Sequence, residues 1–151
     1  MSTPQIFEPI PLGLLLDRVR SLRGQGYRIV QINATTLERT FELTYTFDLD
    51  NCLVNLRLQV PRETPRVPSI SPIYWAAFLY ENEMHDLFGL EVDGMAVDFG
   101  GKFYTTAVKY PFGSTKAPTA KPAPAAVPRP EAPTPAAPPA SSAPAVPADA
   151  P

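Results

Sequence analysis

The pattern of apolar and polar positions over residues 12–60 predicts one helix followed by three strands. The helix is predicted where apolar side chains recur at helical spacing, at Leu12, Leu15, Leu16, Val19 and Leu22. A proline suited to a first helical turn precedes them, and two glycines that end the helix follow. Residues 27–32 are apolar on both faces, as in a central strand. Residues 37–47 and 52–60 alternate strictly around a polar turn, which predicts an antiparallel hairpin with one wet face.

A second helix is expected to begin at Ser71 or Pro72, with Ser71 as its N-cap, and to end near Gly89. Prolines force an irregular, extended link over residues 61–68 before it. One more short strand is expected over residues 103–108. These elements predict an α+β fold, in which two helices pack on one face of a mainly antiparallel sheet of three to four strands.

Composition divides the chain into a folded domain, residues 1–113, and a disordered Pro/Ala-rich tail, residues 114–151. Of the 20 prolines, twelve lie from Pro118 onward, among alanines and almost no large apolar side chains. The single cysteine, Cys52, cannot form an internal disulfide, which fits a reducing compartment. Apolar stretches are far shorter than the about 20 residues of a bilayer span. The net charge of −2 argues against nucleic acid as a partner.

The second half of the second predicted helix concentrates ionisable side chains behind an apolar first half. Glu81 and His85 share a helix face, and Asp86 lies beside them. A metal site would need three or four ligands, but the chain has one histidine and one cysteine. Acid–base catalysis lacks a recognisable nucleophile, phosphate loop or oxyanion site. Residue chemistry therefore favours a structural cluster that fixes a subunit interface, with no catalytic, cofactor-binding or metal-binding residue.

Residues 81–90, Glu-Asn-Glu-Met-His-Asp-Leu-Phe-Gly-Leu, resemble the signature of the 30 kDa subunit family of respiratory complex I. In that family a Glu-Arg-Glu start leads to an aspartate, a large apolar residue, an aromatic residue and a glycine. The matching positions here are Glu81, Glu83, Asp86, Phe88 and Gly89. Asn82 replaces the usual arginine, and the chain lacks the longer ending with a His-Pro and further arginines. Both departures resemble the small subunit of energy-converting (Ech-type) membrane-bound [NiFe] hydrogenases.

This resemblance implies a non-catalytic peripheral-arm subunit on the cytoplasmic face of the membrane, which it meets only through the complex. The chain would dock on the large catalytic subunit. The [NiFe] centre and the iron-sulfur clusters would lie in partner subunits, because one cysteine is too few to hold a cluster. The expected subunit interface consists of the signature helix and residues 94–112, with the acidic side chains meeting basic groups of the large subunit. Its signature residues are Glu81, Glu83, His85, Asp86, Phe88 and Gly89.

Three alternatives remain at this point. The chain could be the equivalent subunit of NADH:quinone oxidoreductase (complex I). It could instead be a stand-alone enzyme that uses Glu81 and His85, which predicts turnover or bound metal in the isolated chain. As a soluble adaptor that recruits partners through its proline-rich tail, it would lose function when residues from Ala117 onward are deleted.

Overall fold

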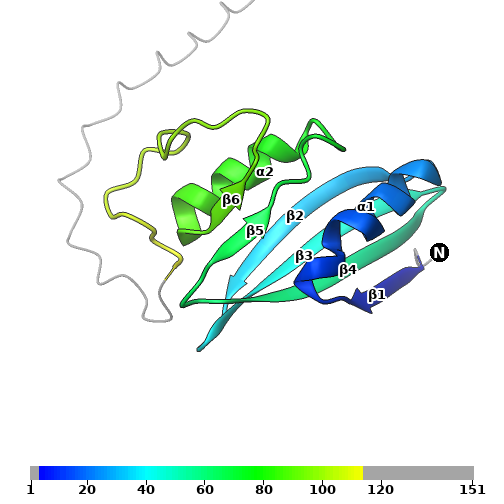
Figure 1. Ribbon diagram of the computed structural model, residues 1–151, viewed down its shortest axis with the longest axis horizontal. Coiled ribbons are helices and arrows are strands. Elements are labelled where there is room, and N and C mark those ends of the chain that lie inside the picture. The colour runs from blue at the N-terminus through cyan, green and yellow to red at the C-terminus, as the bar shows by residue number, and fades with distance from the viewer. Residues whose placement is uncertain (1–3, 114–151) are drawn as a thin grey trace, which may run out of the picture. The chain divides into compact units, whose positions relative to one another are not determined.

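The computed structural model describes residues 4–113, so the predicted tail, residues 114–151, lies outside the described residues and the predicted boundary stays a prediction. The described part of the chain contains two α-helices and six strands, which are labelled in Figure 1. In chain order the elements are β1 (Gln5–Pro9), a 3₁₀ turn (Leu12–Leu14), α1 (Leu15–Gly24), β2 (Arg28–Thr36), β3 (Thr40–Leu49), β4 (Cys52–Pro61), β5 (Arg66–Pro68), α2 (Ala77–Glu83), a π-helical turn (Met84–Phe88) and β6 (Glu91–Asp93).

Four strands form one mixed sheet in the order β1-β4-β3-β2, in which only the β1–β4 pair is parallel. The α+β prediction is confirmed. The β3–β4 hairpin is also confirmed, and its two-residue turn consists of Asp50 and Asn51, both with positive φ, as a type I′ turn requires. Figure 1 shows the long β2, β3 and β4 ribbons side by side, with α1 lying across them. The short strands β5 and β6 pair separately and in parallel.

The core lies on one face of the sheet, beneath both helices. Alternate residues of β3 are buried there, as the period-2 pattern predicts, and they include Phe41 and Phe47. The buried side chains of α1 belong to the same cluster. The Phe47 ring meets Tyr74, just before α2, at 5.3 Å between centroids, and Phe41 meets Phe88 edge-on at 6.5 Å. The segment that contains α2 is therefore fixed against the sheet by aromatic contacts near both of its ends.

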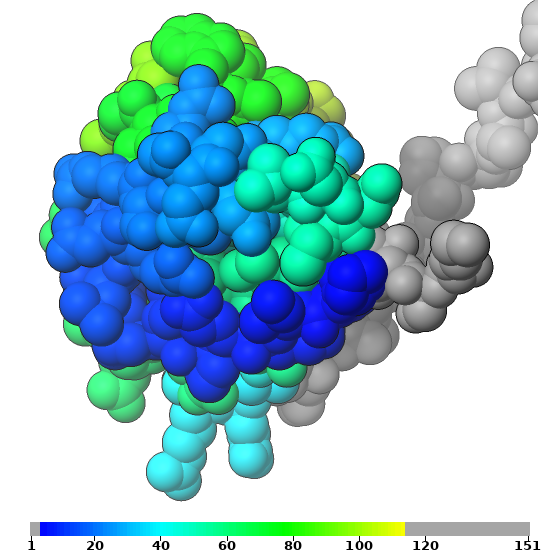
Figure 2. Space-filling model, turned by 90° about the vertical axis from the view of Figure 1, so that its right-hand side faces the viewer, coloured from blue at the N-terminus to red at the C-terminus, as the bar shows by residue number. Residues whose placement is uncertain are grey.

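The N-terminal strand β1 has no counterpart in the sequence-based prediction. Pro4, Pro9 and Pro11 argue against a strand interior, but β1 is an edge strand whose last residue is Pro9, a place where a missing donor is tolerated. Figure 2 shows β1, in dark blue, lying open along the lower part of that face of the molecule. The fourth strand of the sheet is thus β1. The prediction of a strand over residues 103–108 is wrong, because that segment is irregular.

The second helix begins later than predicted. Ser71 does not cap it, because its hydroxyl oxygen accepts the Ala96 N–H at 2.8 Å and lies 2.7 Å from the Ser69 hydroxyl. Residues 71–76 form turns, and the α-helix starts at Ala77. The predicted end is confirmed: Gly89 follows the π-helical turn in the left-handed conformation, with φ of 78°.

Candidate functional site

The signature segment forms the end of α2 and the π-helical turn that continues it. Single π-helical turns inside helices occur often at functional sites. The structure brings the six predicted interface residues together on this one segment, but it divides them by exposure. Glu81 and Asp86 are buried, whereas the other four, Glu83, His85, Phe88 and Gly89, are partly exposed. The buried pair acts inside the chain, and the others border its surface.

Glu81 is an internal hydrogen-bond acceptor. Its side chain is 1% exposed, and its carboxylate accepts the Ser69 hydroxyl at 2.7 Å, the Ile70 N–H at 2.7 Å and the Ser71 N–H at 3.2 Å. The expectation that Glu81 meets a partner's basic group has to be revised, because no exposed oxygen is available for that contact. Burial and the nearby Glu81 charge also raise the pKa of Tyr45 in the core.

Asn82 holds the segment that follows β6. It is fully buried, and its side-chain amide donates to the carbonyl oxygens of Phe78 at 2.7 Å and Val97 at 2.8 Å. Its oxygen accepts the Phe99 N–H at 3.0 Å. The residue that departs from the family pattern therefore uses three of its hydrogen-bonding positions to fix a loop against the helix. Sequence reasoning missed this role, because only tertiary packing shows that Asn82 lies in the core, where a polar amide needs hydrogen-bond partners.

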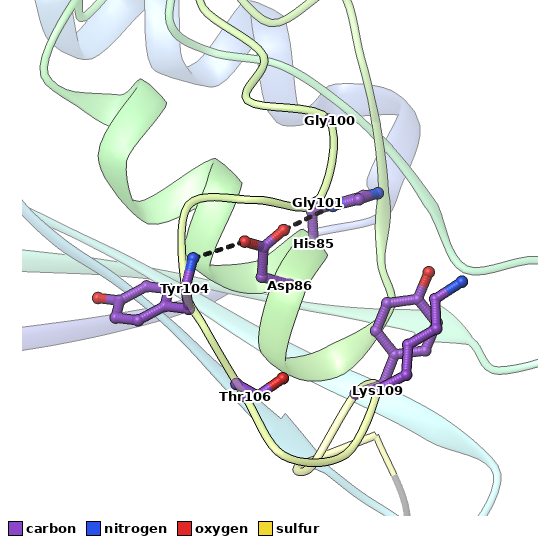
Figure 3. A pocket seen from close by; sticks show the side chains of 8 residues that line it. His85, Asp86, Gly100, Gly101, Tyr104, Thr106 and Lys109 are labelled. Atoms are coloured by element: carbon purple, nitrogen blue, oxygen red, sulfur yellow. Dashed lines mark hydrogen bonds and ion pairs between the residues drawn. The ribbon is translucent and has the colours of Figure 1, made fainter.

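Asp86 connects the π-helical turn to the loop in the same way. One carboxylate oxygen lies 2.9 Å from His85 Nδ1, and the other accepts the Tyr104 N–H at 2.9 Å (Figure 3). The Tyr104 hydroxyl lies 3.4 Å from the Glu83 carboxylate, whose charge, with a smaller contribution from burial, raises the pKa of Tyr104. The backbone of the loop is thus fixed by a buried carboxylate where a strand was expected.

The last contacts are made by Phe88 and Gly89. The Phe88 ring lies 5.7 Å from that of Phe112, and the carbonyl of the neighbouring Leu87 accepts the Phe112 N–H at 2.8 Å. A Cβ on Gly89 would approach the Tyr110 ring to 2.9 Å, so this position needs glycine for space as well as for its positive φ. We call residues 94–113 the C-terminal segment; it follows the helix from Asn82 to Gly89 without forming a strand.

The His85–Asp86 pair borders a pocket of about 380 Å³ between the helix and the C-terminal segment. Thr106 and Lys109 also line this pocket, as Figure 3 shows, but the Thr106 hydroxyl donates to the Val108 carbonyl instead of facing His85. A carboxylate beside Nδ1 can orient an imidazole for proton transfer. No activated nucleophile accompanies the pair among the residues that line the pocket.

Other chemistry finds little support in the described part of the chain. Glu81, which the stand-alone enzyme alternative pairs with His85, does not line the pocket. Within residues 4–113, no three His, Cys, Asp or Glu side chains gather closely enough to hold a metal ion. In the same residues no helix has the length and apolar character needed to cross a membrane. What the arrangement can do is present a surface of fixed shape.

A family comparison identifies this arrangement. Residues 14–98, which extend from the start of the helical region to the C-terminal segment, match the family described as respiratory-chain NADH dehydrogenase, 30 Kd subunit. The chain belongs to this family. The matched residues include α1, the strands β2 to β4 and the whole signature helix. The resemblance to the 30 kDa subunit family based on residues 81–90 is therefore confirmed at the level of the family.

Solved structures share the fold of this 30 kDa family member. One is a chain in the structure of the membrane-bound sulfane sulfur reductase (MBS), an archaeal respiratory membrane complex, with 23% identity and a TM-score of 0.60 over 66% of this chain. This chain spans 62% of the length of that one. Another is a trypsin-resistant fragment of Nqo5, with 20% identity and a TM-score of 0.55 over 62% of this chain and 82% of the fragment. None of the curated proteins is significantly similar in sequence.

Proposed function

We propose that this chain is a non-catalytic peripheral-arm subunit of a membrane-bound, energy-converting [NiFe] hydrogenase of Ech type, in which it docks on the large catalytic subunit. The observation that carries the proposal is the C-terminal segment, which buried side chains of the signature helix hold in an irregular, exposed conformation. A loop that is already ordered in the free chain loses less conformational entropy when it binds, which suits a binding surface. Membership in the 30 kDa subunit family supports a complex I-like respiratory assembly as the one that this surface joins.

Two features favour the hydrogenase within that family. Asn82 stands where complex I members usually have arginine, and here it is satisfied internally instead of reaching toward a partner. Residues 94–113 also lack the His-Pro and further arginines of complex I members, and they turn back along the helix, where Tyr110 meets Gly89 and Phe112 meets Phe88. In complex I members the corresponding segment wraps the neighbouring large subunit.

The equivalent subunit of NADH:quinone oxidoreductase is the second candidate. It is favoured by the description of the matched family and by the likeness to Nqo5. The likeness to a chain of a sulfane sulfur reductase complex supports a respiratory membrane assembly that is broader than either enzyme. In every case the chain would lie on the cytoplasmic face and reach the membrane only through its partners, which would carry the iron-sulfur clusters and, in the hydrogenase, the [NiFe] centre.

The charged part of the proposed interface is smaller than the sequence suggested. Glu83 is partly exposed and has only the Tyr104 hydroxyl, at 3.4 Å, beside its carboxylate, so it can still meet a basic group of the large subunit. The two Asp86 oxygens, in contrast, already contact His85 and Tyr104. Removing one member of a desolvated interfacial ion pair costs about 2–5 kcal/mol of binding. Glu83→Gln should therefore weaken assembly without unfolding the chain.

The experiment that tests the proposal is affinity purification of the tagged full chain from gently solubilised membranes, followed by mass spectrometry and metal analysis. Recovery with a large subunit and iron-sulfur subunits supports the subunit function, and nickel in the eluate decides for the hydrogenase. Iron without nickel, together with quinone reductase subunits, would favour complex I. A chain recovered alone would overturn the proposal, and the His85 pocket would then be assayed for enzyme activity.

A further inference from the structure

A row of partly exposed aromatic rings runs from Trp75, just before α2, onto the C-terminal segment. The rings follow one another in contact, with centroid distances of 5.6, 6.5, 5.2 and 4.9 Å, and together we call them the aromatic strip: Trp75, Phe78, Phe99, Phe103 and Tyr104. Trp75 is 64% exposed, and Phe99 and Tyr104 are 43% and 42% exposed. A contiguous apolar patch of this kind marks an interaction site more often than scattered exposed apolar side chains do.

The strip is held in place by buried polar side chains. Asn82 accepts the backbone N–H of Phe99, and Asp86 accepts that of Tyr104. Because both acceptors lie on the helix, the rings of the C-terminal segment are fixed relative to Phe78 on α2. A surface whose rings are positioned before binding loses less conformational entropy on association.

The charges beside the strip point to a protein partner. Glu83 lies next to Tyr104, and Asp98 precedes Phe99; neither forms an ion pair within residues 4–113. Lys102 is the one basic residue between Phe99 and Tyr104. Arg23 and Arg28 line a hollow together with Trp75 at the other end of the strip, but Arg28 pairs with Asp48 and the Arg23 guanidinium lies over the Tyr74 ring. An anionic membrane surface attracts clusters of unpaired basic residues, and the end of the strip beside Glu83 has no such cluster. The acidic flank instead complements an apolar groove bordered by arginine or lysine.

We infer that the aromatic strip, more than the carboxylates of the signature helix, carries the binding of this chain to its large partner subunit. The inference rests on the proposed function and names the contact chemistry within it. Interfaces concentrate their binding energy in a few central aromatic residues, and Trp and Tyr are enriched among them. The partner surface is accordingly an apolar groove with basic side chains at its border, into which Trp75 and Phe99 insert.

The test compares two double variants of the full tagged chain, each expressed in the native host and purified from its gently solubilised membranes. Trp75→Ala with Phe99→Ala removes two exposed rings of the strip. Ile6→Ala with Phe7→Ala is the matched control, since these β1 side chains are 51% and 54% exposed. Figure 2 shows β1 low on that face, with the green residues of the α2 region at its top. Far-UV circular dichroism verifies folding of both, and Trp75→Ala alone serves if the strip double variant does not fold.

We expect at least a tenfold loss of large subunit recovered with the strip variant and an unchanged amount with the control. Equal recovery with both variants would overturn the inference while leaving the subunit function intact. If even the wild-type chain recovers no partner, the proposed function itself fails. Binding of the isolated chain to phosphatidylglycerol vesicles, or a concentration-dependent dimer in gel filtration, would also overturn the inference if the strip variant abolished either one.

Discussion

Replacement of Glu81 by alanine should destabilise the fold by removing an internal acceptor. The carboxylate binds the Ser69 hydroxyl and the backbone N–H groups of Ile70 and Ser71. Ser71 N–H keeps the Ser69 hydroxyl oxygen as a partner at 3.1 Å, so Ile70 N–H is the donor left without one. An orphaned buried donor costs about 1–3 kcal/mol, and hydrogen bonds to a charged group contribute about 1.5–3 kcal/mol.

Since these two quantities describe overlapping losses, we expect Glu81→Ala to lower the free energy of unfolding by about 2–4 kcal/mol. That is a large part of the about 5–15 kcal/mol that stabilises a typical domain. Glu81→Gln is the matched control. Its carbonyl oxygen can still accept the Ile70 and Ser71 N–H groups, and its amide can donate to the Ser69 hydroxyl, which rotates. The glutamine variant should therefore lose about 1 kcal/mol.

The assay is urea unfolding of the full chain followed by far-UV circular dichroism. The variants should shift the midpoint at an unchanged slope, because the surface exposed on unfolding stays the same. A loss below about 1 kcal/mol for Glu81→Ala would show that the acceptor is not needed. Equal losses for alanine and glutamine would show that the negative charge matters and the hydrogen bonds do not. Either result would refute the reasoning.

Three further predictions follow from single contacts. Gly89→Ala should cost about 1–2 kcal/mol from its left-handed backbone and more from the clash with Tyr110; a Tyr110→Ala background should relieve only the second cost, as urea unfolding of the double variant will show. Burial and the Glu81 charge raise the pKa of Tyr45 in the folded chain, so above pH about 10 this tyrosine loses its proton in the unfolded chain but keeps it in the folded chain. The free energy of unfolding should therefore fall as the pH rises above about 10, and Tyr45→Phe should reduce this fall in unfolding measurements. Asp86→Ala should speed hydrogen exchange of the Tyr104 amide at least tenfold, and an unchanged rate would count against the contact.

The sequence predicted the parts of the fold that repeat a period. The strict alternation over β3 and β4 located the hairpin, and the helical spacing over α1 located the first helix. It failed where structure depends on single long-range contacts. The edge strand β1 is too short and too rich in proline to show a period, and β5 and β6 are three residues each. Residues 103–108 carry strand-forming side chains, yet the Asp86 carboxylate binds the backbone N–H of this segment.

The candidate site was predicted in the same uneven way. The motif over residues 81–90 located the helix that organises the site, because several fixed positions fall within ten residues. It did not show which side chains face inward. Glu81 and Asn82 directly precede Glu83, yet only Glu83 reaches the surface. The helix packs against β2 and residues 69–71 on one side and against the C-terminal segment on another. Burial of this kind comes from tertiary packing and has no local sequence signal.

Hydrogen–deuterium exchange of the purified complex tests the central claim most directly, by comparing the chain in the assembly with the isolated chain. Docking through the C-terminal segment predicts slower exchange of backbone amides over residues 94–112 in the assembly, with β1 unchanged. The α2 helix should also gain protection at its first turn, next to Trp75. Protection confined to β1, with residues 94–112 exchanging equally in both states, would contradict the account.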